Sequence, residues 1–586
     1  MDTLLLRLDE SVTGLFGQWN LWTSAIFTVL AGFLAYQLTT REDPDTHPFL
    51  LARQAQGSPV RQPGESPVYR SQGAPHGMPL NASLNVKDPG ASKWSRGRNG
   101  DLRDIWRQAI AGVREDGPTK GETGRILTVL GTDKAIEHKL ADITRQINLI
   151  GQHIIDQGGN RVAIYLPNSV ELVATLFACA FYDLTAVILP FDEPTDAIIS
   201  MLRRSAADTV VTAPGSFPFD VVVNSYPSLR QLIWVVDEGS KHMDWNEVPQ
   251  GTGSSVNVST WQDIINDSPV DAGKELPPLE GQKAPRDVTV FWKAKPGQQE
   301  EMVRFTSANL ISGVAAQLFA VATSQRIGSS DLFLPADSLA NTHTLVLTLA
   351  ALYSNASVAF NSVAAQADDL AIATRGVSPT ILVATPAALL KTHQDAIARV
   401  NSSAVARTLH RMRVRKLAQG GVMPAANAGG AGANKLRLIL TADRAGAGSR
   451  RLPSAVLADL RVLTGARIIY ALTAAKVAGA VAQTGFFDYR VAEDEQGGCH
   501  FGPPLTSTEV VLRDMGVWKS GDEGSKGEVS SLFFLFFWFI CCLLIWGGLT
   551  DVWYLQIVVR GPCVAGNEAA LGVAGMIRDD NTLTYV

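Results

Sequence analysis

Short apolar runs alternate with segments of helical spacing along most of this chain. Val162 to Leu166 and Thr209 to Thr212 are compact apolar or β-branched runs, whereas Val170 to Tyr182 and Thr195 to Ala206 repeat apolar residues every three or four positions. Such alternation is typical of a mainly parallel sheet covered by helices. Asn168 is expected to cap the first of these helices. The sequence therefore predicts a multi-layer, doubly wound α/β body. Further strands are expected at 186–189, 232–237, 289–292, 302–306, 331–335, 356–360, 380–386 and 436–440, and further helices at 136–157, 309–323 and 342–354.

The N-terminal 40 residues follow a different pattern, because residues 11–40 contain no charged side chain. Their centre, Trp19 to Leu38, is long and apolar enough to cross a hydrocarbon layer of about 30 Å. Trp22 and Tyr36 lie near its ends, where aromatic rings favour the headgroup region. A cleaved signal peptide is the alternative, but residues 1–10 are acidic and the apolar stretch is long. We expect an uncleaved transmembrane anchor.

Composition separates the anchor from the α/β body. Residues 41–100 are rich in Pro, Gly, Ser and Arg and have little apolar periodicity, which predicts a flexible linker. The arginines near the anchor favour a cytosolic body. The predicted domains are an anchor at 1–40, a flexible linker at 41–100, an α/β domain at 101–528, an apolar insert at 529–556 and the remainder of the same α/β domain at 557–586.

The insert contains a second apolar run, from Ser530 to Thr550, which is long enough to span a bilayer. A membrane crossing at this point would separate Gly527-Glu528 from Ile557, which otherwise read as one continuous β-strand. A retained intron explains the run equally well, because valine codons begin with GT, a glutamine codon can end in AG, and thymine-rich codons specify Phe, Leu, Ile, Trp and Cys. Val529 to Gln556 is therefore interpreted as a translated intron, with a second transmembrane helix as the alternative.

Composition excludes several classes of function. With 586 residues, 46% of them apolar, the chain can bury large cores, and its net charge of −5 gives no basic stripe for nucleic acid. The short basic run His410 to Lys416 is interpreted as a solvated helix face. Five cysteines without C-x-x-C spacing and nine histidines without an H-x-x-x-H pair predict neither a disulfide framework nor a metal site.

From Arg161 to the C-terminus the order of segments resembles the AMP-binding, adenylate-forming long-chain acyl-CoA synthetases. Tyr165-Leu166-Pro167-Asn168-Ser169 before a helix, Phe501-Gly502-Pro503-Pro504-Leu505, and Val559-Arg560-Gly561-Pro562 are similar to family segments in order and spacing. The resemblance implies an α/β ligase large domain whose ancestral reaction is ATP-dependent acyl adenylation and thioesterification. It also implies ATP, Mg²⁺ and CoA as the family's cofactors, and an endoplasmic reticulum or peroxisome membrane as the location.

The chain departs from this family at the phosphate-binding loop. The resemblance implies a Thr-Ser-Gly-Thr-Thr-Gly-x-Pro-Lys-Gly loop, but here Phe305-Thr306-Ser307 runs directly into Ala308-Asn309-Leu310, so the glycines and the lysine are absent. Such a loop grips phosphates through successive backbone N–H groups and a lysine. Thr306 and Ser307 are therefore candidate remnants of a nucleotide-binding site.

Other family motifs are also incomplete. In the segment that resembles Tyr-Gly-x-Thr-Glu, Tyr470 and Thr473 remain as candidate nucleotide-binding remnants, but Ala474 replaces the acid that would hold Mg²⁺. Val573 stands where the resemblance implies a ribose-binding aspartate. Arg444 replaces a small residue beside the implied adenine site. The chain ends just before the position of the family's small C-terminal domain and its lysine, so that domain is expected to be missing.

These departures predict a membrane-anchored, fatty acid–CoA ligase-like protein with impaired catalysis. No catalytic or metal-binding residue is assigned, and no cofactor is expected for the sequence as written. The expected partners are a membrane and a fatty acid or acyl chain, and no nucleic acid. The alternatives are an active acyl-CoA ligase whose true gene product contains the missing motifs, and a membrane scaffold that binds no ligand.

Overall fold

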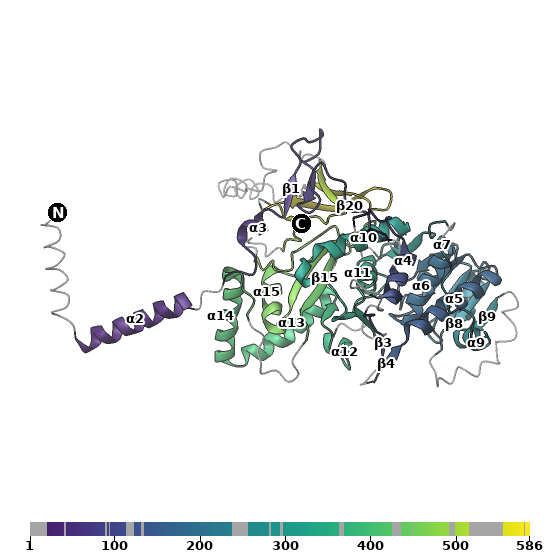
Figure 1. Cartoon of the computed structure of the whole chain (residues 1–586), viewed down its shortest axis with the longest axis horizontal. Coiled ribbons are helices and arrows are strands. Elements are labelled where there is room, and N and C mark those ends of the chain that lie inside the picture. The colour runs from purple at the N-terminus through teal and green to yellow at the C-terminus, as the bar shows by residue number, and fades with distance from the viewer. Residues whose placement is uncertain are drawn as a thin grey trace, which may run out of the picture.

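Three β-sheets and the helices that cover them form the body of the protein (Figure 1). The chain is described by a computed structural model. It describes residues 20–39, 43–87, 91–92, 94–112, 122–130, 134–236, 256–279, 283–293, 297–361, 369–424, 435–448, 451–491, 499–514, 555–578 and 580–585.

A seven-stranded sheet has the order β11-β10-β6-β5-β7-β8-β9, and its pairs are parallel except for β10 with β11 at the edge. All four residues of β7 are buried, because helices cover both faces of the sheet. The strands are β5 (Arg161–Tyr165), β6 (Thr185–Ile188), β7 (Thr209–Thr212), β8 (Gln231–Trp234), β9 (Asn257–Thr260), β10 (Val288–Trp292) and β11 (Glu301–Phe305).

An eight-stranded sheet has the order β17-β16-β15-β14-β12-β13-β3-β4, with antiparallel pairs only at its two edges. The carboxyl ends of its central strands therefore meet at one edge. The strands are β3 (Ile126–Leu130), β4 (Lys134–His138), β12 (Leu332–Pro335), β13 (Ser357–Phe360), β14 (Ile381–Val383), β15 (Leu438–Arg444), β16 (Arg467–Thr473) and β17 (Ala482–Gln483).

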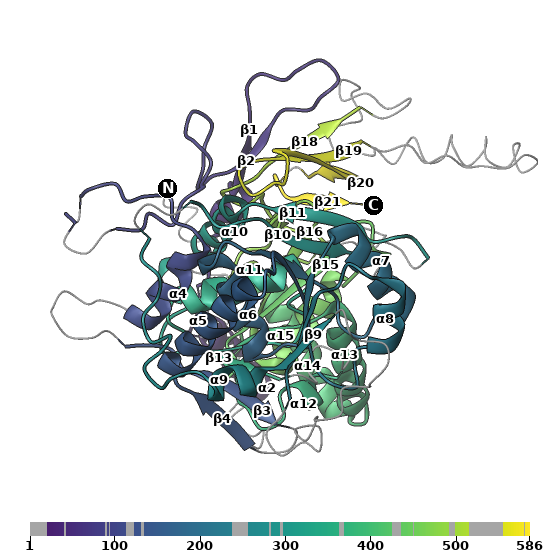
Figure 2. The same cartoon turned by 90° about the vertical axis from the view of Figure 1, so that its right-hand side faces the viewer.

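A six-stranded antiparallel sheet, β1-β2-β18-β19-β20-β21, lies at one end of the two α/β layers (Figure 2). It combines strands from both ends of the described chain. They are β1 (Ala55–Gly57), β2 (Tyr69–Ser71), β18 (Glu509–Arg513), β19 (Gln556–Arg560), β20 (Glu568–Ile577) and β21 (Leu583–Tyr585).

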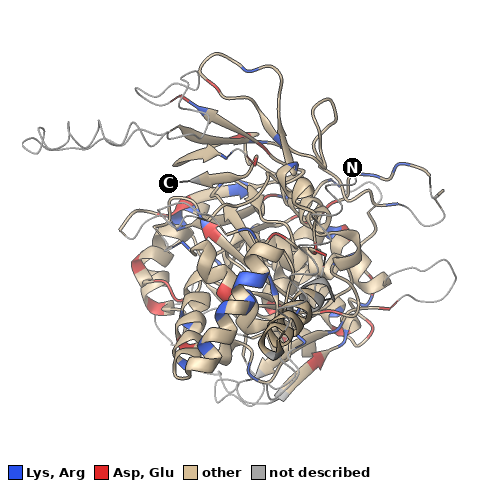
Figure 3. Cartoon of the chain, turned by 90° about the vertical axis from the view of Figure 1, so that its left-hand side faces the viewer, with Lys and Arg blue, Asp and Glu red and all other residues tan. Residues whose placement is uncertain are grey.

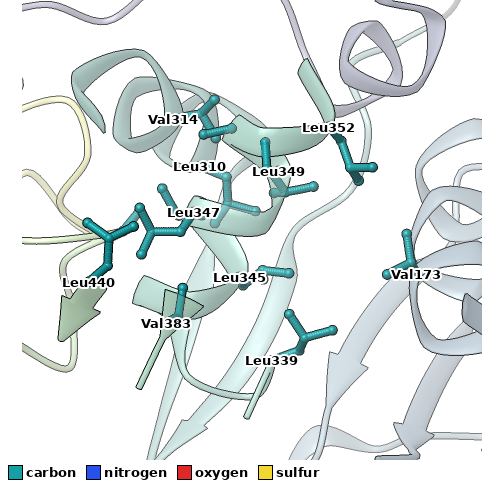
Figure 4. Close-up of a cluster of buried hydrophobic side chains, with 14 of the residues drawn as sticks. Val173, Leu310, Val314, Leu339, Leu345, Leu347, Leu349, Leu352, Val383 and Leu440 are labelled. Atoms are coloured by element: carbon teal, nitrogen blue, oxygen red, sulfur yellow. The ribbon is translucent and has the colours of Figure 1, made fainter. Parts of the chain in front are cut away.

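Most helices pack on the two parallel sheets. In the contact between α10 and α11, Leu310 and Val314 lie beside Leu347 and Leu349 (Figure 4). The helices are α2 (Leu21–Thr39), α3 (Pro48–Ala52), α4 (Leu102–Ala111), α5 (Leu140–Asp156), α6 (Val170–Phe181), α7 (Thr195–Ser205), α8 (Phe219–Ser225), α9 (Trp261–Asn266), α10 (Ser307–Ala320), α11 (Thr342–Tyr353), α12 (Leu370–Ala373), α13 (Pro386–Asn401), α14 (Ala404–Gly420) and α15 (Ser454–Thr464), with a short 3₁₀ helix at Thr323–Gln325.

The α/β prediction is confirmed, with two local corrections. The predicted helix from Ile136 is wrong at its start, because residues 134–138 form β4, which pairs with β3, and α5 begins only at Leu140. Asn168 does not cap α6, since Ser169 accepts the capping bond from the amide of Leu172. The Asn168 amide instead donates to the carbonyls of Pro335 and Asp337, joining the two parallel sheets.

Part of the segment predicted as a flexible linker is built into the body. Tyr69 of β2 pairs with Val510 of β18. Glu65 forms ion pairs with Arg513 at 2.9 Å and with Arg560 at 2.8 Å. These contacts between distant parts of the chain explain why a Pro- and Gly-rich sequence can be ordered here: its partners lie more than 400 residues away and leave no local pattern.

Helix α2 extends away from the body (Figure 1). Among the described residues, none of the helices combines the length and the hydropathy that a membrane crossing requires. The predicted N-terminal span therefore gains no support from the structure. The predicted insert at 529–556 lies outside the described residues except for Leu555 and Gln556, and Gln556 is the first residue of β19.

Candidate functional site

A cavity of about 660 Å³ lies at the edge where the carboxyl ends of parallel strands in the eight-stranded sheet meet. Asp337 follows β12, Thr385 follows β14, and Arg444 and Thr473 end β15 and β16. Arg444 and Thr473 are direct register partners, so both side chains reach the same edge. Trp292, the last residue of β10, lines the cavity from the seven-stranded sheet. The site therefore lies between the two parallel sheets, at a position where α/β proteins commonly bind ligands.

The rest of the lining is partly apolar. Pro386, Ala387 and Leu390 from α13 and Ala442 from β15 contribute carbon surface. Pro386 is the first residue of α13, and Thr385 caps this helix by accepting a bond from the amide of Ala388. The volume is within the range of about 300–1,000 Å³ that is usual for small-molecule sites.

Arg444 is the largely buried cation of this site. Its guanidinium carbon lies 4.4 Å from the centre of the Trp292 ring, a cation–π contact that fixes the side chain over the indole. One terminal nitrogen donates weakly to the Lys293 carbonyl at 3.4 Å, and Nε has no hydrogen-bond partner among the described residues. Burial lowers the pKa of Arg444, while nearby Asp337 opposes this effect. A guanidinium that lines a cavity and forms no ion pair with a carboxylate among the described residues is suited to bind an anion.

Asp337 is the acidic counterpart in the cavity. Its carboxylate accepts bonds from Thr344 Oγ1 at 2.8 Å, from Asn341 Nδ2 at 2.7 Å and from the Ser338 amide at 2.8 Å. Desolvation nevertheless raises the pKa of Asp337, against the effect of these bonds and of Arg444. Asp337 is therefore held by neutral donors at the start of α11, and its charge only partly offsets that of Arg444.

His343 and Thr342 supply buried polar atoms without partners. The two ring nitrogens of His343 have no hydrogen-bond partner among the described residues, and the hydroxyl of Thr342 has none either. Both residues are buried and both line the cavity. Burial lowers the pKa of His343 to about 4, so the ring is neutral at pH 7. Unpaired buried polar atoms are rare, so His343 and Thr342 are unusual members of the cavity wall.

The structure places Thr306 and Ser307 outside this cavity, in helix-capping roles. Thr306 and Asn309 form a reciprocal capping box at the start of α10. The Ser307 hydroxyl accepts a bond from the Leu102 amide at 3.0 Å, which joins α10 to the start of α4. β11 therefore passes directly into α10, with the Thr306 hydroxyl already bonded to the Asn309 side chain.

Of the other two predicted residues, only Thr473 reaches the cavity. Its hydroxyl donates to the Asp443 carbonyl at 2.8 Å. Tyr470 is fully buried, packs against Phe501 with ring centroids 5.0 Å apart, and accepts a bond from the Leu452 amide at 3.2 Å. Thr473 is therefore part of the candidate site, whereas Tyr470 supports the sheet behind it.

The residues present do not fit a Mg²⁺–ATP complex. The turn into α10 has no loop of successive glycine amides, and Ala474 after β16 is buried and offers no oxygen ligand. Val573 on β20 cannot accept a bond from a ribose hydroxyl. In the described part of the chain no group of three His, Cys, Asp or Glu side chains could hold a metal ion. The available chemistry is anion binding beside an apolar surface.

Sequence reasoning missed Asp337, Trp292 and His343 as members of one site. Trp292 ends β10, Asp337 follows β12, and His343 lies in the first turn of α11. Their position at the end of a strand or the start of a helix is the one sequence signal that could have indicated them. Arg444 was noticed only as a bulky residue at an implied adenine site.

Residues 140–287 match the model of a family described as AMP-binding enzyme. This range contains α5, β5 to β9 and the helices between them. No curated protein sequence matches the chain.

Three solved structures have a fold similar to that of this chain. The anthranilate CoA ligase AuaEII in complex with anthranoyl-AMP has a TM-score of 0.55 and 15% identity, over 83% of this chain and 76% of that one. A long-chain-fatty-acid-CoA ligase, FadD1 from Archaeoglobus fulgidus, has a TM-score of 0.54 and 13% identity, over 86% of each chain. Coronafacic acid ligase from Pectobacterium brasiliense has a TM-score of 0.53 and 11% identity, over 83% and 78%. The resemblance predicted from the sequence is confirmed.

Proposed function

We propose that this chain, which has the fold of the adenylate-forming CoA ligases, binds a long-chain fatty acid in the cavity at Arg444 and does not adenylate it. The observation that carries the proposal is the Arg444 guanidinium, which lines a partly apolar cavity of about 660 Å³ and forms no ion pair with a carboxylate among the described residues. A carboxylate can accept bonds from the guanidinium, and the acyl chain can cover the apolar lining.

The site residues also favour binding without adenylation. Loss of one preorganised group that stabilises developing charge typically lowers the rate by about 10²–10³. Here the glycine loop with its lysine is absent at Thr306, and Ala474 and Val573 replace two acids. Even if these losses are far from additive, acyl-adenylate formation by the chain as written is expected to fall below detection.

The proposal includes attachment to a membrane through α2 and the residues around it. Helix α2 has no charged residue, and Trp22, Phe27 and Val29 are more than half exposed. An exposed apolar helix that leaves the body is consistent with a lipid environment. A cytosolic body on the endoplasmic reticulum or peroxisome membrane remains part of this proposal.

The first prediction tests the ligand by calorimetry with the purified full-length protein. A long-chain fatty acid is expected to bind more tightly than the corresponding fatty alcohol, because only the acid can pair with Arg444. Arg444→Gln is expected to weaken acid binding about 10–100-fold, in line with about 1.5–3 kcal/mol for a hydrogen bond to a charged group. Binding of the alcohol should change little.

Arg375→Gln is the matched control, because this exposed arginine lies outside the cavity lining and its loss changes the net charge equally. Equal affinity for acid and alcohol, or equal losses in the two variants, would contradict carboxylate binding at Arg444.

A second assay measures ATP binding, and acyl-CoA formation from ATP, a long-chain fatty acid and CoA. Micromolar ATP affinity or acyl-CoA formation above background would contradict the impaired function and favour an active ligase.

A further inference from the structure

Helix α14 exposes a mixed basic and apolar face. Its sequence contains no acidic residue. Val405, Leu409 and Met412 are 78%, 46% and 64% exposed, and their spacing of four and three places them on one side of the helix. At about 100° per residue, Arg413 and Arg415 lie to either side of this apolar stripe and Lys416 lies within it, whereas Arg407 and Arg411 lie towards the opposite side of the helix. The basic residues of α14 are Arg407, Arg411, Arg413, Arg415 and Lys416.

The opposite face of α14 packs against the body of the protein. Leu417 is fully buried with Ala458 and Tyr489, and Val414 packs against the same cluster. In the described part of the chain, none of the four arginines of α14 forms an ion pair with a carboxylate. The nearby carboxylate of Asp459 is bonded instead to His393 at 3.0 Å and to His410 at 2.9 Å. The exposed face therefore has no role in the packing of the body.

The chain that follows α2 is fastened beside the C-terminal end of α14. The amide of Asp45 donates to the Gly421 carbonyl at 2.9 Å, and the carboxylate of Asp45 accepts a bond from the Tyr489 hydroxyl at 2.7 Å. Thr39 and Asp45 are six residues apart, which can span at most about 20 Å. The C-terminal end of α2 therefore lies close to α14, on the side of the molecule that Figure 3 presents.

We propose that the exposed face of α14 rests on the surface of a lipid bilayer that contains anionic lipids. A basic helix with a narrow apolar stripe lies in the headgroup region, where its apolar side chains enter the acyl boundary and its cations meet lipid phosphates. The net charge of the whole chain is −5, so this basic face is the part that an anionic surface attracts and it orients the body. The cavity would then have a fixed orientation relative to the membrane.

The inference extends the proposed function and can fail independently of it. Binding of α2 depends on apolar surface, because the helix has no charge, and should occur with neutral and anionic lipids alike. Binding of α14 depends on lipid charge. The alternative is that an acidic protein binds the exposed face of α14. An experiment with vesicles and no other protein distinguishes this alternative from binding to lipid.

The test is hydrogen–deuterium exchange of full-length protein bound to vesicles of phosphatidylcholine, with and without about one-third phosphatidylserine. Amides of residues 404–420 are expected to exchange several-fold more slowly on the anionic vesicles. Raising the salt to about 1 M should remove the difference, because the screening length falls from about 10 Å at 0.1 M to about 3 Å.

Arg413→Gln/Arg415→Gln should weaken the binding that depends on anionic lipid by about 25-fold, since each basic residue near such a surface contributes a factor of about five in binding. Arg230→Gln/Arg304→Gln is the matched control, because it removes two exposed arginines, one just before β8 and one in β11, and should leave the dependence intact. Equal exchange of α14 on the two kinds of vesicle, no binding to anionic vesicles, or equal loss in both variants would overturn the proposal.

Discussion

Single residues at the cavity show how burial sets charge. His343 has no hydrogen-bond partner among the described residues, and its burial lowers the pKa to about 4 from an ordinary value of 6.5. Asp337 is held by three donors, yet desolvation raises its pKa. Arg444 is stabilised by the Trp292 ring rather than by a close carboxylate. The cavity is therefore lined by two cationic side chains, Arg444 and Lys391, and by two groups, His343 and Asp337, whose neutral forms are favoured by burial.

The second prediction concerns the pH dependence of stability. Because the pKa of His343 is lower in the folded protein, the unfolded chain binds more protons between pH 6.5 and about 4. The stabilisation is complete above pH 6.5 and is lost as the pH falls towards 4, by up to roughly 3 kcal/mol. His343→Leu should therefore flatten the profile of unfolding free energy between pH 7 and 4, measured by urea denaturation.

A His343→Leu protein with the same slope as the parent would show that His343 is not buried in its neutral form.

Among the elements, the pairing of β18 with β19 bears on the apolar insert. Arg513 pairs with Gln556 and Glu509 pairs with Arg560 in an antiparallel register, so the two strands can be joined by a hairpin connection. Removal of residues 529–556 would place Glu528 where Gln556 now pairs, with residues 515–527 left as the connection. We therefore expect the six-stranded sheet to form without the insert.

The third prediction is that a protein without residues 529–556 folds and is at least as stable as the full chain. Thermal unfolding followed by circular dichroism, together with resistance to protease, would measure this. Val558→Asp in the same background should unfold the sheet, because Val558 is fully buried in β19. Aggregation of the deletion variant would support a structural role for the insert, and sequencing of the transcript would test the intron interpretation directly.

Across the whole molecule, the N-terminal segment connects the helix outside the body to the sheet at its far end. Asp45 contacts Gly421 and Tyr489, and β1 and β2 extend the sheet that contains β18. Glu65 joins Arg513 and Arg560, and these contacts lower the pKa of Glu65. The proposed attachment through α2 and the stability of the body can therefore be tested separately by choosing where the chain is truncated.

The fourth prediction compares two truncations. Deletion of residues 1–40 should release the protein from membranes washed with carbonate and leave its unfolding midpoint unchanged, because the Asp45 contacts remain. Deletion of residues 1–75 should also lower the midpoint, because it exposes the edge of β18 and leaves two arginines without Glu65, at a cost of about 1–3 kcal/mol. Equal midpoints for the two proteins would contradict a structural role for β1 and β2.

The sequence by itself determined the elements whose pattern is local. The strand at Thr209–Thr212 and the helices from Val170 and Thr195 are placed as predicted, because burial on both faces produces continuous apolar runs and burial on one face produces helical spacing. The order of these elements was also enough to indicate the fold of the adenylate-forming ligases.

Only the tertiary structure decided which residues share a site. Trp292, Asp337, His343 and Arg444 come from β10, the loop after β12, α11 and β15, and no local pattern relates them. The same holds for Thr306 and Tyr470, whose residue types allow a ligand contact but whose hydrogen bonds are made within the protein. Long-range strand pairing likewise placed β1 and β2 in a sheet, because their stabilising partners are distant in sequence and contribute nothing to the pattern of the segment itself.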